Sequence, residues 1–111
     1  MDDIEEEAGP PEIQLWTWSG RYFGSSDGVA LWTHTGRLAG RFHQDEVYGA
    51  AGRYLGEVRD TDRLITNSSK KNKSQGPFGI RRRHTRSLRD PQNSRSMLDG
   101  FEDFPAPGEF A

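Results

Sequence analysis

The sequence contains no cysteine, so it can form no disulfide bond, no thiolate metal site and no cysteine nucleophile. A small secreted domain with little apolar content usually depends on disulfides, and their absence favours a reducing compartment. The N-terminus, Met1–Glu7, is acidic where a secretory signal would be basic and then apolar. No run approaches the roughly 20 apolar residues of a membrane-spanning helix. We therefore expect a soluble, cytoplasmic protein with no membrane partner.

Apolar residues are also scarce, at 32% of the 111 residues, against roughly 45–50% in an ordinary domain. All tryptophans and tyrosines lie between Trp16 and Tyr54, which indicates one short folded core diluted by polar sequence. The sequence predicts a single small domain with disordered ends. Its four expected segments are an acidic disordered N-terminus (1–12), a β-domain (13–67), a basic disordered strip (68–95) and an acidic, aromatic C-terminal tail (96–111).

No cluster of residues points to catalysis or to metal binding. The three histidines, at positions 34, 43 and 84, are far apart and stand in no Glu-x-x-His pattern. No Ser-His-Asp arrangement is recognisable. We therefore expect no catalytic residue, no metal ligand and no cofactor, and we expect that the protein is not an enzyme.

What the sequence does contain is a repeat with a period of 16 residues. The pattern Gly-Arg-x-x-Gly begins at Gly20, Gly36 and Gly52. Each copy is preceded by an apolar–aromatic pair at the same spacing: Leu15-Trp16, Leu31-Trp32 and Val47-Tyr48. Each unit therefore predicts a β-hairpin whose turn holds the first glycine, because glycine tolerates the positive φ of tight turns. The second glycine falls in the outgoing strand, where it indicates a bend or the close approach of another backbone.

Two positions depart from this regularity. Phe42 and Val58 follow the second and third units, whereas the first unit has Ser26 in that column, which predicts a weaker outgoing strand. His34 replaces Trp18 in another column, which we therefore expect to face solvent.

A fourth unit is only half present. Leu64–Asn67 supplies its first strand, but Ser68-Ser69-Lys70 stands where Gly-Arg should follow. Single hairpins are marginal in water, so the units must pack on one another. We expect an all-β fold of four short hairpins around a pseudo-fourfold axis. Whether the segment near Ile13 completes the fourth hairpin and closes the ring stays open.

The motifs also carry a resemblance to a known family. The start Trp-x-Trp-x-Gly-Arg-Tyr-Phe-Gly (16–24), the repeated Gly-Arg-x-x-Gly, and the run Asp-Arg-Leu-Ile-Thr-Asn (62–67) resemble the bacterial 4-fold beta flower family. The similarity covers roughly residues 13–73, with a fainter echo at 100–105. It implies four hairpins around a central axis, and it implies no activity.

Two sets of basic residues are candidate anion sites. The repeat would place Arg21, Arg37 and Arg53 at equivalent points of a ring, where they either bind an anion together or simply lie exposed and pair with nearby acids. The second set belongs to the strip, since residues 1–66 carry a net charge of −6, residues 70–95 carry +8 and residues 96–111 carry −4. Such strips bind phosphate backbones by counterion release, or serve as solvated tails. The candidate polyanion-binding residues are Lys70, Lys71, Lys73, Arg81, Arg82, Arg83 and Arg86.

The aromatic residues allow a third kind of surface. The six tryptophans and tyrosines either form a platform for stacking bases or sugars, or fill the core of a very small domain. We favour the core. The sequence therefore predicts a small non-catalytic binding or adaptor module whose partner is an unidentified protein. The alternative is a nucleic-acid-associated protein that uses residues 70–95. The sequence indicates neither the partner nor the oligomeric state.

Overall fold

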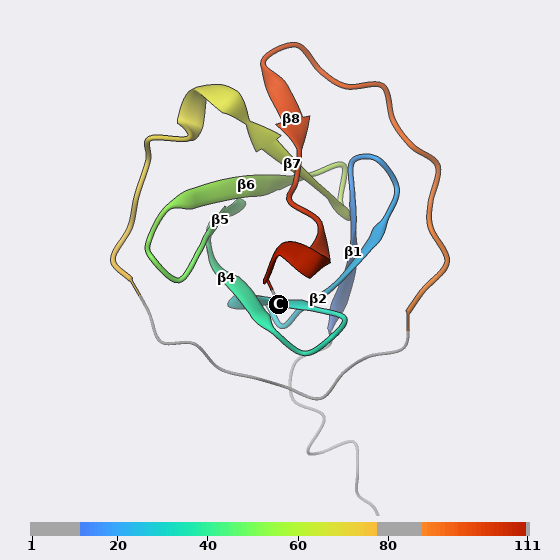
Figure 1. Cartoon of the computed structure of the whole chain (residues 1–111), viewed down its shortest axis with the longest axis horizontal. Coiled ribbons are helices and arrows are strands. Elements are labelled where there is room, and N and C mark those ends of the chain that lie inside the picture. The colour runs from blue at the N-terminus through green and yellow to red at the C-terminus, as the bar shows by residue number, and fades with distance from the viewer. Residues whose placement is uncertain (1–11, 78–87, 111) are drawn as a thin grey trace, which may run out of the picture.

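The computed structural model describes residues 12–77 and 88–110, which form eight strands and two short 3-10 helices. Figure 1 shows the strands arranged around a central axis. The elements, in chain order, are β1 (Ile13–Thr17), β2 (Tyr22–Ser26), β3 (Ala30–Thr33), β4 (Leu38–His43), β5 (Glu46–Tyr48), β6 (Tyr54–Arg59), β7 (Arg63–Asn67), η1 (Ser68–Lys70), β8 (Phe101–Asp103) and η2 (Pro107–Phe110).

Seven of the strands close into a barrel. Each strand from β1 to β7 pairs antiparallel with the next. The ring closes where β1 and β7 run parallel, with Trp16 opposite Arg63 and Thr17 opposite Leu64. Closure leaves no free edge among these strands. The predicted all-β fold of hairpins around an axis is confirmed.

The 16-residue repeat corresponds to three hairpins with the same register. Leu15 lies opposite Gly24, Leu31 opposite Gly40, and Val47 opposite Gly56. In each hairpin a β-bulge follows this pair, so the next residues in register are Trp16 with Tyr22, Trp32 with Leu38, and Tyr48 with Tyr54. The bulge bends the strands at the same place in each unit, which a closed barrel this small requires.

The two glycines of each unit have separate purposes. The turn glycines Gly20, Gly36 and Gly52 have φ values of 99°, 88° and 89°, which confirms the predicted turns. The second glycine lets the next unit approach. A Cβ on Gly40 would lie 2.6 Å from the carbonyl oxygen of Tyr48, and one on Gly56 would lie 2.6 Å from that of Ile65.

The fourth hairpin is completed by the C-terminal part of the chain. β8 pairs antiparallel with the second half of β7, with Asn67 opposite Phe101 and Ile65 opposite Asp103. The segment near Ile13 closes the ring instead, through the first half of β7. The first and the last strand of the domain, β1 and β8, therefore both pair with β7. The faint echo of the repeat at residues 100–105 corresponds to β8 and the residues beside it.

The barrel interior is filled mainly by aliphatic residues, with two phenylalanines. Its buried cluster consists of Leu15, Phe23, Leu31, Ala39, Val47, Leu64 and Phe104. The tryptophans and tyrosines lie outside this cluster, but five of the six are buried, as expected. Trp32 packs with Ala30 and Leu38 in a second buried cluster, and Trp16 meets Tyr22 edge-on at 5.4 Å between ring centroids. Trp18, expected to face solvent, is only 4% exposed.

The described parts of the segments after residue 67 are folded onto the barrel, which corrects the expectation of disordered tails. We call residues 71–77 and 88–100 the strap, and Figure 1 shows them running around the outside. The amide of Gln75 donates to the carbonyl of Gly52, and that of Gln92 to Gly20. Gly20 and Gly52 are therefore also needed for close packing, since a Cβ on either would collide with the strap. The domain extends to Phe110 and does not end at Asn67.

Candidate functional site: a cavity at the mouth of the barrel

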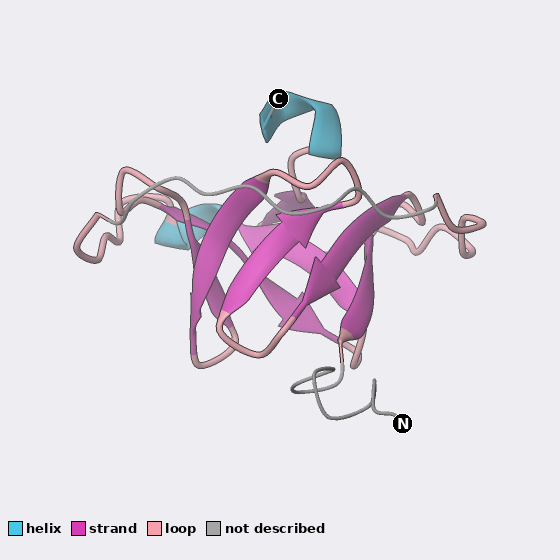
Figure 2. Ribbon diagram, turned by 90° about the horizontal axis from the view of Figure 1, so that it is seen from below, coloured by secondary structure: helices cyan, strands magenta, loops and turns pink. Residues whose placement is uncertain are grey.

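The two ends of the barrel differ. At the end formed by the hairpin turns, η2 caps the barrel (Figure 2). There Phe104 contacts Phe23 edge-on at 5.2 Å between ring centroids, and Phe110 stacks against Phe104 at 6.4 Å. We call the opposite end, formed by the turns that connect successive units, the mouth.

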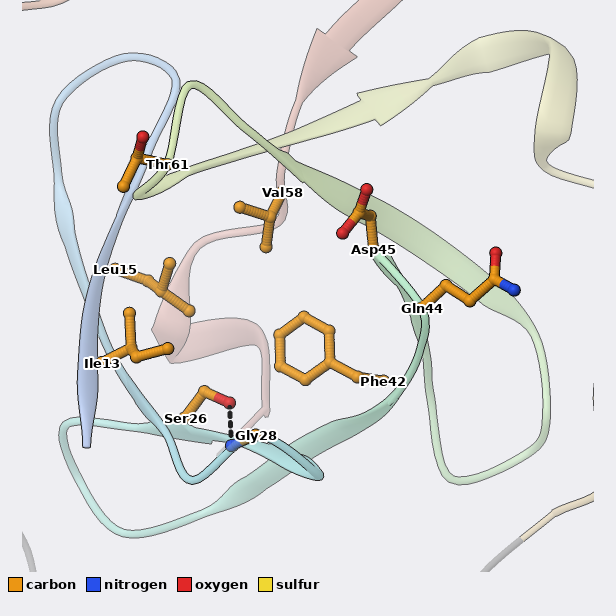
Figure 3. A pocket seen from close by; sticks show the side chains of 9 residues that line it. All are labelled: Ile13, Leu15, Ser26, Gly28, Phe42, Gln44, Asp45, Val58 and Thr61. Atoms are coloured by element: carbon orange, nitrogen blue, oxygen red, sulfur yellow. Dashed lines mark hydrogen bonds between the residues drawn. The ribbon is translucent and has the colours of Figure 1, made fainter. Parts of the chain in front are cut away.

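A cavity of about 200 Å³ opens at the mouth. Figure 3 shows the apolar side chains projecting toward its centre and the polar ones near its edge. Its described lining residues are Ile13, Leu15, Ser26, Gly28, Phe42, Gln44, Asp45, Val58 and Thr61. An apolar cavity of roughly 150 Å³ can hold a benzene molecule. This one therefore has room for a single ring or a branched alkyl group.

The cavity follows from a departure in the repeat. Phe42 and Val58 occupy the same column of the second and third units and both point into the mouth, whereas the first unit has Ser26 there. The Ser26 hydroxyl accepts a hydrogen bond from the amide of Gly28 at 2.9 Å, which stabilises the turn between units. The first unit thus has a small side chain that stabilises the turn, in place of a larger apolar side chain that would fill the mouth.

Among the described residues, the mouth carries an available carboxylate, that of Asp45. Asp45 lines the cavity and is exposed. Within residues 12–77 and 88–110 its carboxylate makes no ion pair or side-chain hydrogen bond. The other acids in these turns have partners: Asp27 accepts from the amides of Val29 and Ala30, and Asp60 pairs with Arg95 at 2.7 Å.

The lysines of the predicted polyanion strip form ion pairs with the protein's own acids. Lys70 Nζ lies 2.9 Å from both Glu46 Oε2 and Glu57 Oε1, and Lys73 Nζ lies 3.0 Å from Glu46 Oε1. The hydrogen bonds from Lys70 and Tyr48 lower the pKa of Glu46 to about 2. The carboxylates of Glu46 and Glu57 raise the pKa of Lys70. This cluster attaches η1 and the start of the strap to the barrel.

Two other described bases of the strip also have partners. Lys71 pairs with Glu102 at 2.9 Å, and the guanidinium of Arg95 also lies 5.4 Å from the Trp18 ring centroid. The remaining members of the predicted site, Arg81, Arg82, Arg83 and Arg86, lie outside the described residues. The structure therefore brings Lys70 and Lys73 together as internal partners of Glu46 rather than as a free basic surface.

The repeat arginines occupy equivalent positions on three separate hairpins. The carbonyls of Arg21, Arg37 and Arg53 accept from the amides of Thr17, Thr33 and Gly49 at 2.8 Å. Figure 1 shows the three hairpin turns pointing away from the axis in different directions. Of the three, Arg21 lines an open cleft of about 710 Å³, with His34 and Arg89 among its neighbours.

Arg63 is a structural residue that sequence reasoning did not single out. It is 2% exposed, and burial lowers its pKa. Its guanidinium donates to the carbonyls of Trp18 and Asn93, at 3.1 and 2.7 Å, and to Gln92 Oε1 at 3.1 Å. It joins β1, β7 and the strap. The sequence did contain a signal for this role: Arg63 stands in the column of Leu15 and Leu31, where the repeat otherwise has apolar residues.

Comparison of the chain with known protein families, curated proteins and solved structures finds no match. The resemblance to the 4-fold beta flower family therefore stays a prediction. Among the described residues there is no helix long and apolar enough to cross a membrane, and no group of three or more potential metal-ligating side chains.

Proposed function

We propose that the protein is a small non-catalytic binding module that holds one apolar group in the cavity at its mouth. The observation that carries this proposal is the difference between the two ends of the barrel. One end is closed by Phe104 and Phe110 from the chain itself. The other has an open cavity lined by Leu15, Phe42 and Val58.

The chemistry of the lining supports binding rather than reaction. Apolar side chains exclude water and contribute affinity in proportion to the area they bury. The carboxylate of Asp45, at the edge, can orient a ligand, whereas the Gln44 side chain points away from the centre of the cavity (Figure 3). The described lining residues include no histidine, lysine or arginine, and the Ser26 hydroxyl accepts the amide of Gly28, which supports binding more than reaction.

The test is a titration with 2-phenylethanol, a neutral probe of about the right size, followed by ¹⁵N–¹H spectra of the full chain. We expect concentration-dependent shifts at the amides of Leu15, Gly28 and Val58 that saturate with a single dissociation constant. Ser26→Val, which introduces the residue of the third unit, should weaken binding at least fivefold by filling the cavity. Ser94→Val, the same change at an exposed position of the strap, should leave binding unchanged.

Two results would contradict the proposal. One is a set of shifts spread over the surface that do not saturate. The other is saturable binding that Ser26→Val leaves unaltered although its spectrum shows a folded protein, since the probe would then bind elsewhere.

The alternative function, nucleic-acid association through residues 70–95, now depends on fewer residues. Lys70, Lys71 and Lys73 have intramolecular acidic partners, and a polyanion would have to compete with those carboxylates. The alternative therefore depends on the other bases of the strip, among them Arg81, Arg82, Arg83 and Arg86, and its test is given below.

A further inference from the structure

We infer that the group held in the cavity belongs to an organic cation: a small amine whose ammonium pairs with Asp45 while its apolar part occupies the space beside Phe42. This inference rests on the proposed function and specifies the chemical class of its ligand. Three features of the mouth lead to it, namely the charge of the lining, the partners of the neighbouring acids and the size of the apolar space.

The charge of the lining has one sign. Of the nine described residues around the cavity, Asp45 is acidic and none is basic. A carboxylate ligand would meet this negative charge without a compensating donor, whereas an ammonium would find a partner at the edge. The lining therefore discriminates against anions and favours cations.

Asp45 differs from the neighbouring acids because its carboxylate has no hydrogen bond or ion pair to the described residues. Asp27 caps the following turn, and Asp60 pairs with Arg95. Asp62 accepts a hydrogen bond from the side-chain amide of Gln92 at 3.3 Å. In the described part of the chain only the backbone carbonyl of Asp45 is engaged, by the amide of Val58 at 2.9 Å. The backbone thus fixes the position of Asp45 while its carboxylate stays available.

The size of the space limits the apolar part. A cavity of about 200 Å³ holds one ring or branched alkyl group. Asp45 stands at the edge, close to the solvent, so the charged end of the ligand keeps part of its hydration and avoids the cost of burying a charge. A phenyl or cyclohexyl group joined to an ammonium by a short linker satisfies both conditions.

The experiment compares three probes with the same ring: 2-phenylethylammonium, 2-phenylethanol and 3-phenylpropionate. Dissociation constants are measured from amide shifts of the full chain at low salt and in 1 M NaCl. We expect the ammonium to bind about fivefold more tightly than the alcohol, as for an exposed ion pair, and the carboxylate to bind more weakly than both. The preference should shrink in 1 M NaCl because the pair is screened.

Asp45→Asn should abolish the preference for the ammonium, so that the ammonium and the alcohol bind with equal affinity. Asp60→Asn is the matched control, since it removes an acid from the same end that does not line the cavity, at a φ of 52° that asparagine also tolerates. This control should retain the preference for the ammonium.

The ammonium can belong to a free small amine or to the N-terminus of a protein, and a phenylalanyl dipeptide amide distinguishes these two sources. It carries the same ring beside a chain-terminal ammonium. Tighter binding than the free amine indicates a protein terminus, and weaker binding indicates a free amine.

The possible failures are distinguishable. Equal binding of the ammonium and the alcohol, with both sensitive to Ser26→Val, would overturn the cationic ligand while leaving the cavity as a binding site. A preference for the ammonium that persists in Asp45→Asn would overturn the role of Asp45. Absence of binding by all three probes would overturn the proposed function itself.

Discussion

Glu46→Gln removes the acid that links the strap to the barrel. The Glu46 carboxylate receives the ammonium groups of Lys70 and Lys73, together with the hydroxyl of Tyr48 at 2.7 Å. Lowering its pKa from 4.5 to about 2 corresponds to roughly 3 kcal/mol, at about 1.4 kcal/mol for each pKa unit. The side chains of Lys70 and Lys73 are 32% and 49% exposed, so solvent screens part of this energy. We expect Glu46→Gln to destabilise the protein by about 1–2 kcal/mol at pH 7.

The pH dependence gives the sharper test of the same prediction. Because the pKa of Glu46 is lower in the folded state, its stabilisation is complete above about pH 5 and is lost as the pH falls toward 2. In urea unfolding at several pH values, the free energies of unfolding of the wild type and Glu46→Gln should converge at acidic pH. Because both proteins share the other carboxylates, the difference between them reports Glu46 alone. Glu102→Gln, which breaks the exposed pair with Lys71, is the control and should cost under about 0.5 kcal/mol. Equal stability of wild type and Glu46→Gln at every pH would refute the reasoning.

Three further predictions concern the fold and the alternative function. Phe104→Ala should cost about 3–5 kcal/mol in urea unfolding, because Phe104 fills the barrel from beyond the repeat; an unchanged midpoint would mean that the C-terminal segment is not part of the domain. Gly36→Val should cost more than about 1 kcal/mol, since its φ is 88°, and an unchanged melting temperature would contradict the turn. Neutralising Arg81, Arg82 and Arg83 to glutamine should reduce the salt dependence of any DNA or RNA binding by about one unit of slope per lost contact, measured by fluorescence anisotropy; no binding by the intact protein at moderate salt would exclude this function.

The repeat made the hairpins predictable because local rules determine them. A glycine at positive φ and an apolar–aromatic pair before it are short-range signals, and their period of 16 residues implied equivalent registers. The second glycine of each unit also predicted a contact between units, since Gly40 and Gly56 leave space for the backbone of the next unit. Repeats are readable in this way because each unit packs mainly against its neighbours.

The strap was not predictable from composition. Residues 68–100 have few apolar side chains, and disorder was inferred because such a segment cannot bury enough apolar surface. Its described parts gain order in another way, through backbone hydrogen bonds to Gly20 and Gly52 and through ion pairs with Glu46 and Glu102. The acidic net charge of the barrel was visible in the sequence, but which acids would meet which lysines depends on the folded surface.

The cavity was equally hidden, although its cause lay in the alignment of the repeats. The alignment identifies Ser26 as the weak member of the column that contains Phe42 and Val58, and the sequence alone predicts a weaker strand there. The strand forms, with Ser26 opposite Ile13, and the missing volume appears at the mouth instead. Closure of the barrel, which directs one column of side chains to a common point, turns a local substitution into a site.

The closed end and the open end of the barrel thus both arise where the units differ. The fourth unit lacks its Gly-Arg turn, so the chain leaves the barrel after Asn67, and in β8 it returns with Phe104 to fill one end. The first unit lacks a large residue at Ser26, so the other end stays open. The packing of Leu15, Leu31, Val47 and Leu64 fixes the barrel and constrains those positions strongly. The residues at the edge of the mouth belong to exposed turns, where substitutions cost the fold least, so the lining of the proposed site can vary while the barrel stays the same.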